Sequence, residues 1–366
     1  MQALVNSHYH LSKFSPYSVR ALFFKRMPML SNYYPIHIKS IPANRLSRIS
    51  RLKKVIKTLV ETYSKRSARH SKRQQGMAYH NHLGQWAEQF NRHLVGQTAA
   101  ITTDTNAIRI QQFGKLGRIR LYGDLGLLQG GDINVYLYTD NWRSIHYQKH
   151  QEPSSLICFD DSHDQAWGLS CPSLKLELAN QHLRLSLPEP HPPAPQKAST
   201  KVDINELRQM WASLTQVHQF YDMLSLFKLD LLEAITLMQD QWTHPITSSQ
   251  LTNFLQQCFE HKLNCKIMAG NRGIVHELNA PIKLLQLAPE TLTINGDNYR
   301  CEVNLLSIKQ AWLVKRATKR GIAHSLEAFD DHGRLILQIQ EQKPSDQPES
   351  SLWMRCLGRQ GIISLP

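Results

Sequence analysis

Long hydrophobic runs are missing from this chain of 366 residues. No stretch approaches the roughly 20 apolar residues that a helix needs to cross a bilayer. The earliest apolar patch, residues 21–24, is too short for the core of a signal peptide, and Lys25 and Arg26 follow it directly. We therefore predict a cytoplasmic protein.

Cysteine pairs with redox or zinc spacing are also absent. The six cysteines are scattered, and no two of them form a C-x-x-C motif. Cys258 and Cys265 flank His261, but one such trio does not define a metal site. We expect free, buried, structural thiols in a reducing compartment.

Sequence motifs for nucleotide binding and hydrolysis are lacking as well. The chain has no Walker loop and no G-x-G-x-x-G, G-x-S-x-G or H-E-x-x-H pattern. His276 and Glu277 lack the second histidine of a zinc protease and lie in a strand-like stretch. Any redox activity would therefore have to come from a bound cofactor.

Acidic residues are nearly absent from the first 75 positions. This segment holds 16 Lys and Arg with Glu61 as its single acid, whereas the rest of the chain holds 27 basic and 28 acidic residues. The net charge of +14 thus belongs to a basic amino-terminal extension, residues 1–75. A neutral body argues against specific nucleic-acid binding by the fold as a whole.

Within this extension, residues 44–63 have apolar side chains every three or four positions, which predicts a basic amphipathic helix. Such a helix can lie on an anionic membrane or a nucleic acid, or it can dock its apolar stripe on the body. We favour docking. The rival function is therefore non-enzymatic binding of nucleic acid or a membrane surface through this tail.

A proline-rich linker, residues 188–202, divides the remaining chain into two parts, 76–187 and 203–366. The first part has a helix candidate at 82–95 and then short alternating runs between 101 and 169, which is typical of antiparallel sheet. The second part has helical spacing over 203–227, a capping box at Asp230 and Glu233, a helix at 249–259, and strand texture over 266–340.

Short strings recur between the two parts. The string SLICFDD at 155–161 returns as SLEAFDD at 325–331, and residues 106–108 align with 272–274. Gly131 and Asp132 correspond roughly to Gly296 and Asp297. These matches predict an internal duplication and an α+β fold of two similar halves, each a large antiparallel β-sheet with flanking helices. A cleft between such halves is a common place for a ligand.

Three features carry candidate ligand chemistry. His218 lies one turn after Leu214 and near Tyr221 on an apolar helix face, where a neutral imidazole can bind haem iron; spacing alone favours a core histidine. Cys171, followed by proline, forms a dipeptide sometimes associated with a haem thiolate contact, but it ends the first β unit, and a structural thiol is favoured. The basic run 309–320 can grip carboxylates, although a solvated hairpin is favoured.

Several blocks resemble the bacterial hemin-degrading factor or hemin transport family (HemS/HmuS-like). They are residues 270–274, 311–318 and 325–336 in the second part and 101–108, 123–131 and 132–142 in the first. Residues 211–224 resemble the segment that carries the family's axial histidine. The resemblance covers about residues 82–360, and residues 1–75 match poorly.

The resemblance implies one haem in the cleft between the halves, with His218 as the ligand to its iron. It implies haem contacts by Gln338 and Lys343. The family's distal arginine is replaced by Tyr136, followed by the retained aromatic Tyr138. An arginine after the histidine helix falls near Leu231, leaving Lys228 as a substitute, and a tyrosine near the end becomes Gln340.

Tyr136 bears on mechanism. An arginine can hold an oxygen species over iron, whereas a tyrosine can coordinate ferric iron and so become a distal ligand. We therefore predict intracellular haem binding and trafficking for iron acquisition. Oxidative haem degradation, which the family implies, would need oxygen and an external electron donor, so enzymatic activity is left open. Expected partners are an inner-membrane haem transporter and a downstream haem acceptor or reductase, with the chain a monomer or homodimer.

Overall fold

The structure is a computed structural model. It describes residues 70–148, 154–160, 163–172, 174, 185–186, 202–215, 218–239, 241–279, 281–344 and 347–363. The predicted amphipathic helix at 44–63 and the linker up to residue 201 lie outside the described residues, as do the side chains of residues 70–79 and of His218. The predicted domain boundaries stay predictions.

Helices and strands follow the order expected from the repeat. The helices are α3 (His70–His93), α5 (Ile204–Ala212), α6 (His218–Phe227), α7 (Leu231–Leu237), α8 (Ser248–Glu260) and α9 (Ser351–Arg359). The strands of the first half are β1 (Thr98–Asp104), β2 (Ile108–Lys115), β3 (Arg118–Tyr122), β4 (Leu125–Gln129), β5 (Val135–Tyr138), β6 (Trp142–Gln148), β7 (Ser155–Asp160), β8 (Gln165–Ser170) and β9 (Leu185–Ser186). Those of the second half are β10 (Thr243–Ile246), β11 (Cys265–Gly270), β12 (Ile274–Asn279), β13 (Leu284–Leu287), β14 (Thr291–Asn295), β15 (Tyr299–Asn304), β16 (Gln310–Thr318), β17 (Gly321–Phe329) and β18 (Leu335–Glu341).

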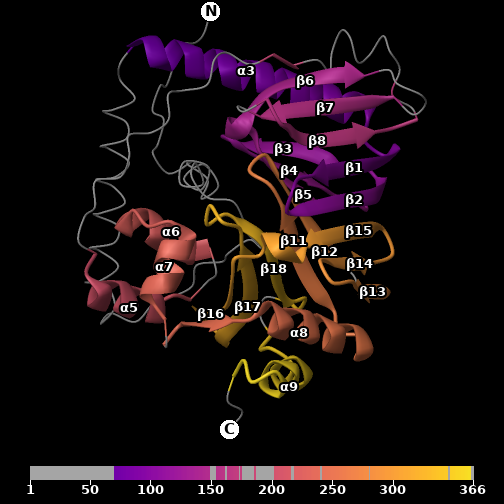
Figure 1. The fold of residues 1–366 in the computed structure, drawn as a ribbon. Coiled ribbons are helices and arrows are strands. Elements are labelled where there is room, and N and C mark those ends of the chain that lie inside the picture. The colour runs from indigo at the N-terminus through magenta and orange to yellow at the C-terminus, as the bar shows by residue number, and fades with distance from the viewer. Residues whose placement is uncertain are drawn as a thin grey trace, which may run out of the picture.

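Two nine-stranded antiparallel sheets form the described fold, and both halves of the chain contribute strands to each (Figure 1). Sheet A has the order β13-β14-β15-β2-β1-β8-β7-β6-β9, and sheet B has the order β10-β16-β17-β18-β11-β12-β5-β4-β3. The first half thus places β3–β5 in sheet B, and the second places β13–β15 in sheet A. The expected pair of antiparallel sheets is confirmed, with an exchange of strands that the sequence did not indicate.

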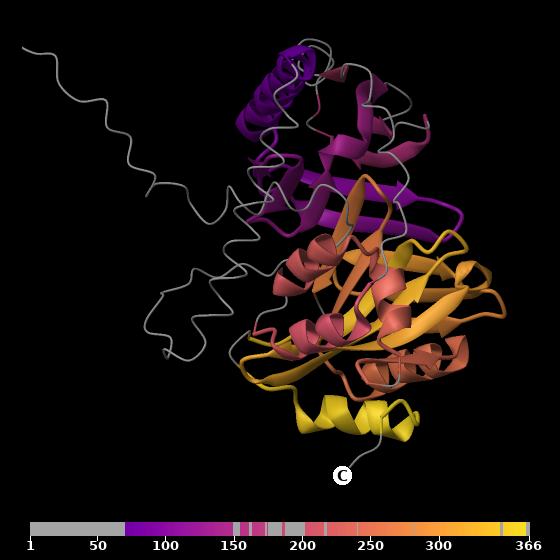
Figure 2. The same cartoon turned by 90° about the vertical axis from the view of Figure 1, so that its left-hand side faces the viewer.

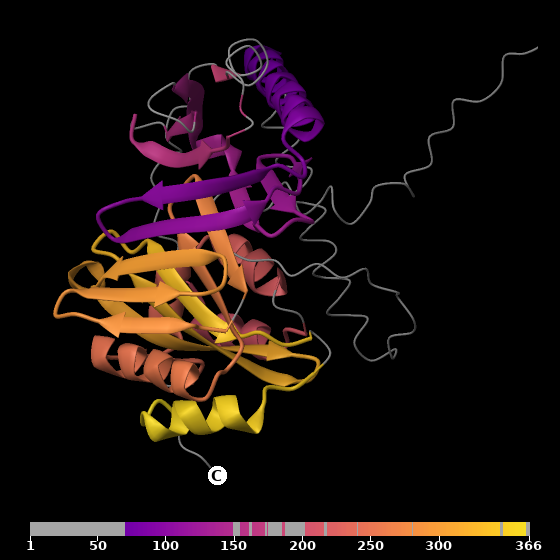
Figure 3. The same cartoon turned by 90° about the vertical axis from the view of Figure 1, so that its right-hand side faces the viewer.

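The exchange creates two seams of backbone hydrogen bonds between the halves. In sheet A, β15 pairs with β2, so that the indigo and orange strands run side by side in Figure 3. In sheet B, β12 pairs with β5. The seams are equivalent, because the N–H of Tyr138 donates to Gly273 O at 3.0 Å and the N–H of Asn304 donates to Ala107 O at 2.9 Å.

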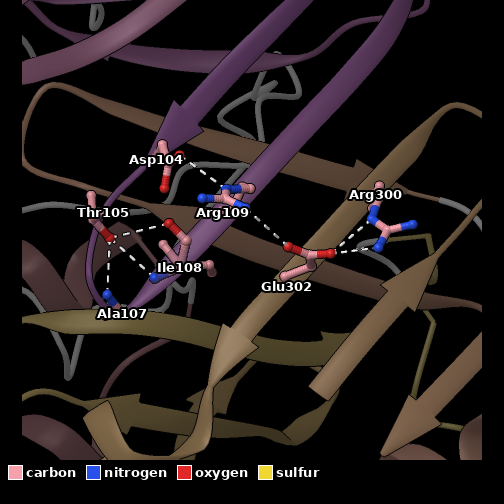
Figure 4. Close-up of polar contacts among 7 residues, drawn as sticks. All are labelled: Asp104, Thr105, Ala107, Ile108, Arg109, Arg300 and Glu302. Carbon is pink, nitrogen blue, oxygen red and sulfur yellow. Dashed lines mark hydrogen bonds and ion pairs between the residues drawn. The ribbon is translucent and has the colours of Figure 1, made fainter. Parts of the chain in front are cut away.

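Charged side chains cross the seam of sheet A (Figure 4). Arg109 Nε donates to Asp104 at 2.9 Å, and Arg109 Nη1 lies 3.8 Å from Glu302 on the other half. Arg300 Nε donates to the opposite carboxylate oxygen of Glu302 at 2.9 Å. These side chains are mostly exposed, and exposed ion pairs contribute little stability, so the backbone pairing and the core hold the seam.

The duplication is visible in matching local irregularities. A β-bulge falls between Cys158 and Phe159 of β7 and between Ala328 and Phe329 of β17. After each bulge, the backbone N–H of an aspartate closes a turn onto the carbonyl four residues later at 2.9 Å. Because bulges are specific features of a strand pair, their agreement supports the recurring strings as equivalent strands.

Three apolar clusters fill the described part of the fold. The first packs α8 and α9 and strands of sheet A against sheet B, and the second packs α3 on the first half. The third packs α5, α6 and α7 on sheet B (Figure 2). In β11, Ile267 and Ala269 belong to the first cluster and Met268 to the third. Since side chains alternate along a strand, the third cluster lies on the outer face of sheet B, away from sheet A.

The helical spacing over 203–227 conceals a break. Helix α5 ends at Ala212 and α6 begins at His218. Near the break, Gln219 Oε1 accepts hydrogen bonds from the backbone N–H of Thr215 at 2.8 Å and from its hydroxyl at 3.1 Å. A side chain here takes the place of a helical carbonyl, which apolar spacing cannot reveal.

The predicted capping box and the predicted buried thiols are confirmed. Glu233 Oε2 accepts the backbone N–H of Asp230 at 2.6 Å, as the capping box requires. All six cysteines are buried free thiols. Among the described residues, no group of three His, Cys, Asp or Glu side chains is arranged to hold a metal ion. In the same part of the chain, no helix is long and apolar enough to span a bilayer.

Candidate functional site

A polar row lies under the helices on the outer face of sheet B. Cross-strand pairing joins Glu277 to Met268, Met268 to Gln338, and Gln338 to Glu327. Glu327 pairs in turn with Trp312. Paired residues point to the same face of a sheet, so these five side chains form one line across β12, β11, β18, β17 and β16. Because α5–α7 cover this face, the polar members of the row, Glu277, Gln338 and Glu327, lie inside an apolar core.

Arg316 of β16 bonds to this row. Its Nη1 donates to Ser325 Oγ and to Glu327 Oε1, both at 2.6 Å. Glu327 Oε1 also accepts Gln338 Nε2 at 2.6 Å and Ser325 Oγ at 2.8 Å. Arg316, Glu327 and Gln338 are only 3%, 0% and 1% exposed. A guanidinium and a carboxylate therefore meet where water has almost no access.

Four polar atoms of this group have no hydrogen-bond partner among the described residues. They are Arg316 Nε and Nη2, Glu327 Oε2 and Gln338 Oε1. Buried polar atoms are normally paired, and each bond left unmade costs about 1–3 kcal/mol. Nε and Nη2 form one edge of the guanidinium, which matches the two oxygens of a carboxylate. The group thus has spare capacity for a polar ligand.

Helix α6 covers Arg316 with aromatic rings. The Phe220 ring centroid lies 4.4 Å from Arg316 Cζ, and Trp211 of α5 meets Phe220 edge-on at 4.6 Å. Burial opposes the charge of Arg316, but Glu327 and Tyr221 together favour it, and the pKa of the guanidinium is raised. Burial also raises the pKa of Tyr221, which stays a neutral phenol. The site is thus a buried, charged guanidinium covered by the aromatic rings of α5 and α6.

Tyr136 begins a second polar group beside the row. Its hydroxyl donates to Glu277 Oε2 at 2.6 Å. Glu277 Oε1 accepts Asn279 Nδ2 at 2.5 Å and lies 3.5 Å from Lys266 Nζ. Tyr136 is 3% exposed, and Glu277 and Lys266 are also buried. Two halves of the chain build this group, since Tyr136 is on β5 and the others are on β11 and β12.

The structure brings some predicted site residues together and separates others. Tyr136, Tyr138 and Gln338 are all buried on or beside the outer face of sheet B. Lys228 follows α6, is exposed, and has a left-handed backbone with φ 56°. Lys343 lies beyond β18, where its Nζ donates to Gln347 O at 2.5 Å. Haem contacts by Lys228 and Lys343 stay predictions.

His218 is the first residue of α6, and its side chain lies outside the described part. The same first turn of the helix carries Phe220 and Tyr221, which are both buried in the third cluster. Its backbone position therefore places it at the start of the helix that roofs the polar row. Its role as an iron ligand stays a prediction.

Sequence reasoning missed part of this site. The run 309–320 was expected to be a solvated hairpin, which is right for the exposed Lys319 and Arg320 but wrong for Arg316. Glu327 and Glu277 were not recognised as site residues. A signal existed, because each is an acid directly followed by an apolar residue in a strand-like stretch, where an unpaired buried charge is costly. Cys171 is buried directly after β8, as expected for a structural thiol.

Comparison with known proteins bears directly on this region. Residues 228–358 match the family model described as "Haemin-degrading HemS.ChuX domain". The resemblance to the hemin-degrading HemS family is confirmed. The HemS-like match contains β10–β18 and therefore every strand that the second half contributes to the site.

Two relatives extend the HemS likeness into the first half. The hemin transport protein HemS of Yersinia enterocolitica is 27% identical over 280 residues, covering 71% of this chain and 79% of its own. The hemin transport protein HmuS of Yersinia pestis is 26% identical over 280 residues, covering 72% and 80%.

Solved structures share the fold. PhuS, a heme-binding protein from Pseudomonas aeruginosa, superposes with a TM-score of 0.64 at 20% identity, covering 74% of this chain and 83% of its own. ChuS, an E. coli heme oxygenase, gives a TM-score of 0.62 at 20% identity, covering 74% and 86%. At this identity the likeness establishes the two-sheet architecture alone.

Proposed function

We propose that this protein binds haem between α6 and the outer face of sheet B, and that it serves haem trafficking for iron acquisition. The observation that carries the proposal is the unpartnered guanidinium edge of Arg316, formed by Nε and Nη2, beneath an apolar, aromatic layer. A planar apolar ring with carboxylates at one edge fits such a site. The HemS-like family model and relatives support haem as that ligand.

Each part of haem has a matching group in this proposal. One propionate takes the free edge of Arg316, where a charge-assisted, bidentate bond is strongest. The ring packs against the aromatic and aliphatic side chains of the third cluster. His218 of α6 supplies the imidazole for the iron, and Tyr136 and Tyr138 face it from β5. Because these side chains are buried, haem entry has to displace α6.

Delivery of haem is favoured over its breakdown. The distal position carries Tyr136, bonded to a carboxylate, instead of a cation that would hold an oxygen species. Haem degradation would draw electrons from a separate donor. In this proposal the protein acts in the cytoplasm, receives haem from an inner-membrane transporter and passes it to an acceptor or reductase, and the basic extension is not needed for haem binding.

Titration of the full chain with hemin, followed by visible absorption, tests the proposal. We expect a saturable Soret band at one hemin per chain. His218→Ala should weaken or shift this band, because an imidazole ligand sets the iron spectrum. His332→Ala is the matched control, since His332 is an exposed histidine of the β17–β18 turn, and it should leave the band unchanged.

Two results would count against the proposal. One is a spectrum that keeps changing with added hemin and never saturates, as nonspecific adsorption produces. The other is a saturable band that His218→Ala leaves intact while high salt abolishes it, which would point to binding through the basic extension.

A further inference from the structure

We propose that Glu277 is a positioning residue for Tyr136, which makes this face select porphyrins that carry a ferric ion. This inference rests on the proposed function. The inference adds two points to the proposed function. Glu277 acts without touching haem, and the feature of the ligand that the site recognises is its ferric ion. Glu277 would act through one hydrogen bond and two supporting contacts.

The geometry fixes the direction of the Tyr136 hydroxyl. A phenol has one hydrogen to donate, and Tyr136 gives it to Glu277 Oε2 at 2.6 Å. A carboxylate paired with a lysine has no hydrogen to return. Tyr136 Oη therefore presents only lone pairs to anything that lies over this face. Lone pairs suit a Lewis-acidic metal ion and cannot donate a hydrogen bond to an iron-bound oxygen species.

Glu277 is itself held in place. Its other oxygen, Oε1, accepts Asn279 Nδ2 at 2.5 Å and lies 3.5 Å from Lys266 Nζ. Lys266 and Glu277 are 7% and 8% exposed, so the pair is mostly removed from water. Rotating Glu277 away would break the ion pair with Lys266 and the hydrogen bond from Tyr136 together. The carboxylate thus has one stable orientation, toward Tyr136.

Strand pairing alone does not explain this arrangement. Backbone pairing already joins β5 to β12, with Val275 opposite Tyr136. Apolar side chains of the third cluster pack around this pair of strands, so the strands do not need the ion pair of Lys266 and Glu277 to stay together. A buried ion pair adds little stability there, because desolvation offsets its attraction. The ion pair lies beside Tyr136, the predicted distal ligand, so we assign it the role of orienting that side chain.

Affinities of the full chain for hemin and for metal-free protoporphyrin IX test the inference. The two ligands share the ring and the propionates and differ in the ferric ion. We expect Glu277→Gln, which keeps the shape and removes the charge, to weaken hemin binding at least fivefold and to change protoporphyrin binding less than twofold. The effect should vanish in a Tyr136→Phe background, because a positioning residue has nothing left to orient.

Controls separate this inference from the proposed function. Glu302→Gln changes a glutamate at the seam of sheet A and should leave both affinities unchanged. If Glu277→Gln fails to fold, Lys266→Met with Glu277→Gln removes the ion pair as a unit and should give the same loss. Absorption of the hemin complex gives a second readout, since a Tyr136-dependent band should be weakened in Glu277→Gln.

Equal loss of affinity for both porphyrins would overturn the inference, as would a loss that persists in Tyr136→Phe. Either outcome would leave haem binding intact and make Glu277 merely structural. If the wild-type chain shows no saturable hemin binding, the proposed function itself fails, and this inference fails with it.

Discussion

Arg316 shows how one residue can indicate a ligand. Ser325 and Glu327 both accept hydrogen bonds from its Nη1, and the other edge of the guanidinium, Nε with Nη2, has no partner in the described protein. Stability alone would not favour such an arrangement, because each unmet buried bond is unfavourable. A ligand with a carboxylate resolves this imbalance, and haem has two.

Removing the charge of Arg316 should weaken hemin binding. We expect Arg316→Met with Glu327→Gln to lower hemin affinity about 10- to 100-fold, which corresponds to the 1.5–3 kcal/mol of a charged hydrogen bond. The paired change avoids leaving Glu327 as an isolated buried carboxylate. Lys319→Met at the exposed tip of the same hairpin is the control. Equal affinities for the two variants in a hemin titration would contradict the assignment.

His276 gives a second prediction at this scale. It is fully buried between the sheets, where its ring nitrogens lie 3.1 Å from Thr103 Oγ1 and 3.2 Å from Gln112 Oε1. Burial lowers its pKa from 6.5 to about 3. The unfolded chain therefore binds a proton below pH 6.5 that the folded chain does not, so the folded state loses stability as the pH falls toward 3.

Between pH 6.5 and pH 5, this linkage should remove about 2 kcal/mol from the free energy of unfolding. Denaturant unfolding at several pH values measures it. His276→Gln should flatten the pH dependence over this range, whatever it does to the absolute stability. A slope identical in the wild type and the variant would show that His276 does not carry the effect.

At the scale of elements, the two halves protect their sheet edges differently. Strand β3 is one of the two edge strands of sheet B, and Asn91 of α3 covers it by donating to Ile119 O at 2.8 Å and accepting the Ile119 N–H at 2.7 Å. The equivalent edge strand of sheet A, β13, exposes Leu287 instead. An uncovered edge invites pairing with other chains, so the side chain of Asn91 blocks that route on one side.

Asn91→Ala should lower the free energy of unfolding by about 1–3 kcal/mol, because two partly buried backbone groups lose their partner. Arg92→Ala on the same helix removes only an exposed pair with Glu88 and should cost less than about 0.5 kcal/mol. Chemical denaturation compares them. Hydrogen exchange at the Ile119 amide should also speed up in Asn91→Ala, and an unchanged rate would argue against the bond.

Elements were the most predictable level of this protein. The strings at 155–161 and 325–331 correctly marked equivalent strands, because a bulge and a turn need the same residues in both copies. The break between α5 and α6 was hidden, since Thr215 and Gln219 make it through a side-chain bond that apolar spacing does not record. Arg316 and Glu327 escaped notice because their pairing depends on strand register.

At the scale of the whole molecule, the exchanged strands make each half incomplete. Strand β12 pairs with β5 of the first half, and β2 pairs with β15 of the second. Neither pairing could be foreseen from a repeat, since duplicated strands fit equally well within their own half. The exchange places Tyr136 beside Glu277, so the site itself depends on both halves.

Residues 203–366 produced alone should therefore not form a stable monomer. The edge of β12 would lack its partner, and exposed edges pair with other chains. Size-exclusion chromatography should show dimers or aggregates, and co-expression with residues 1–202 should restore a one-to-one complex. A monomeric, cooperatively folded 203–366 would mean that the seam contributes little to folding.

The central claim is that haem lies on the outer face of sheet B under α6. A crystal structure of the full chain with hemin tests it most directly. We predict the iron bonded to His218, with Tyr136 on the opposite side of the ring and a propionate on Arg316 Nε and Nη2. Haem held instead by the first 69 residues, or on the outer face of sheet A, would contradict the account.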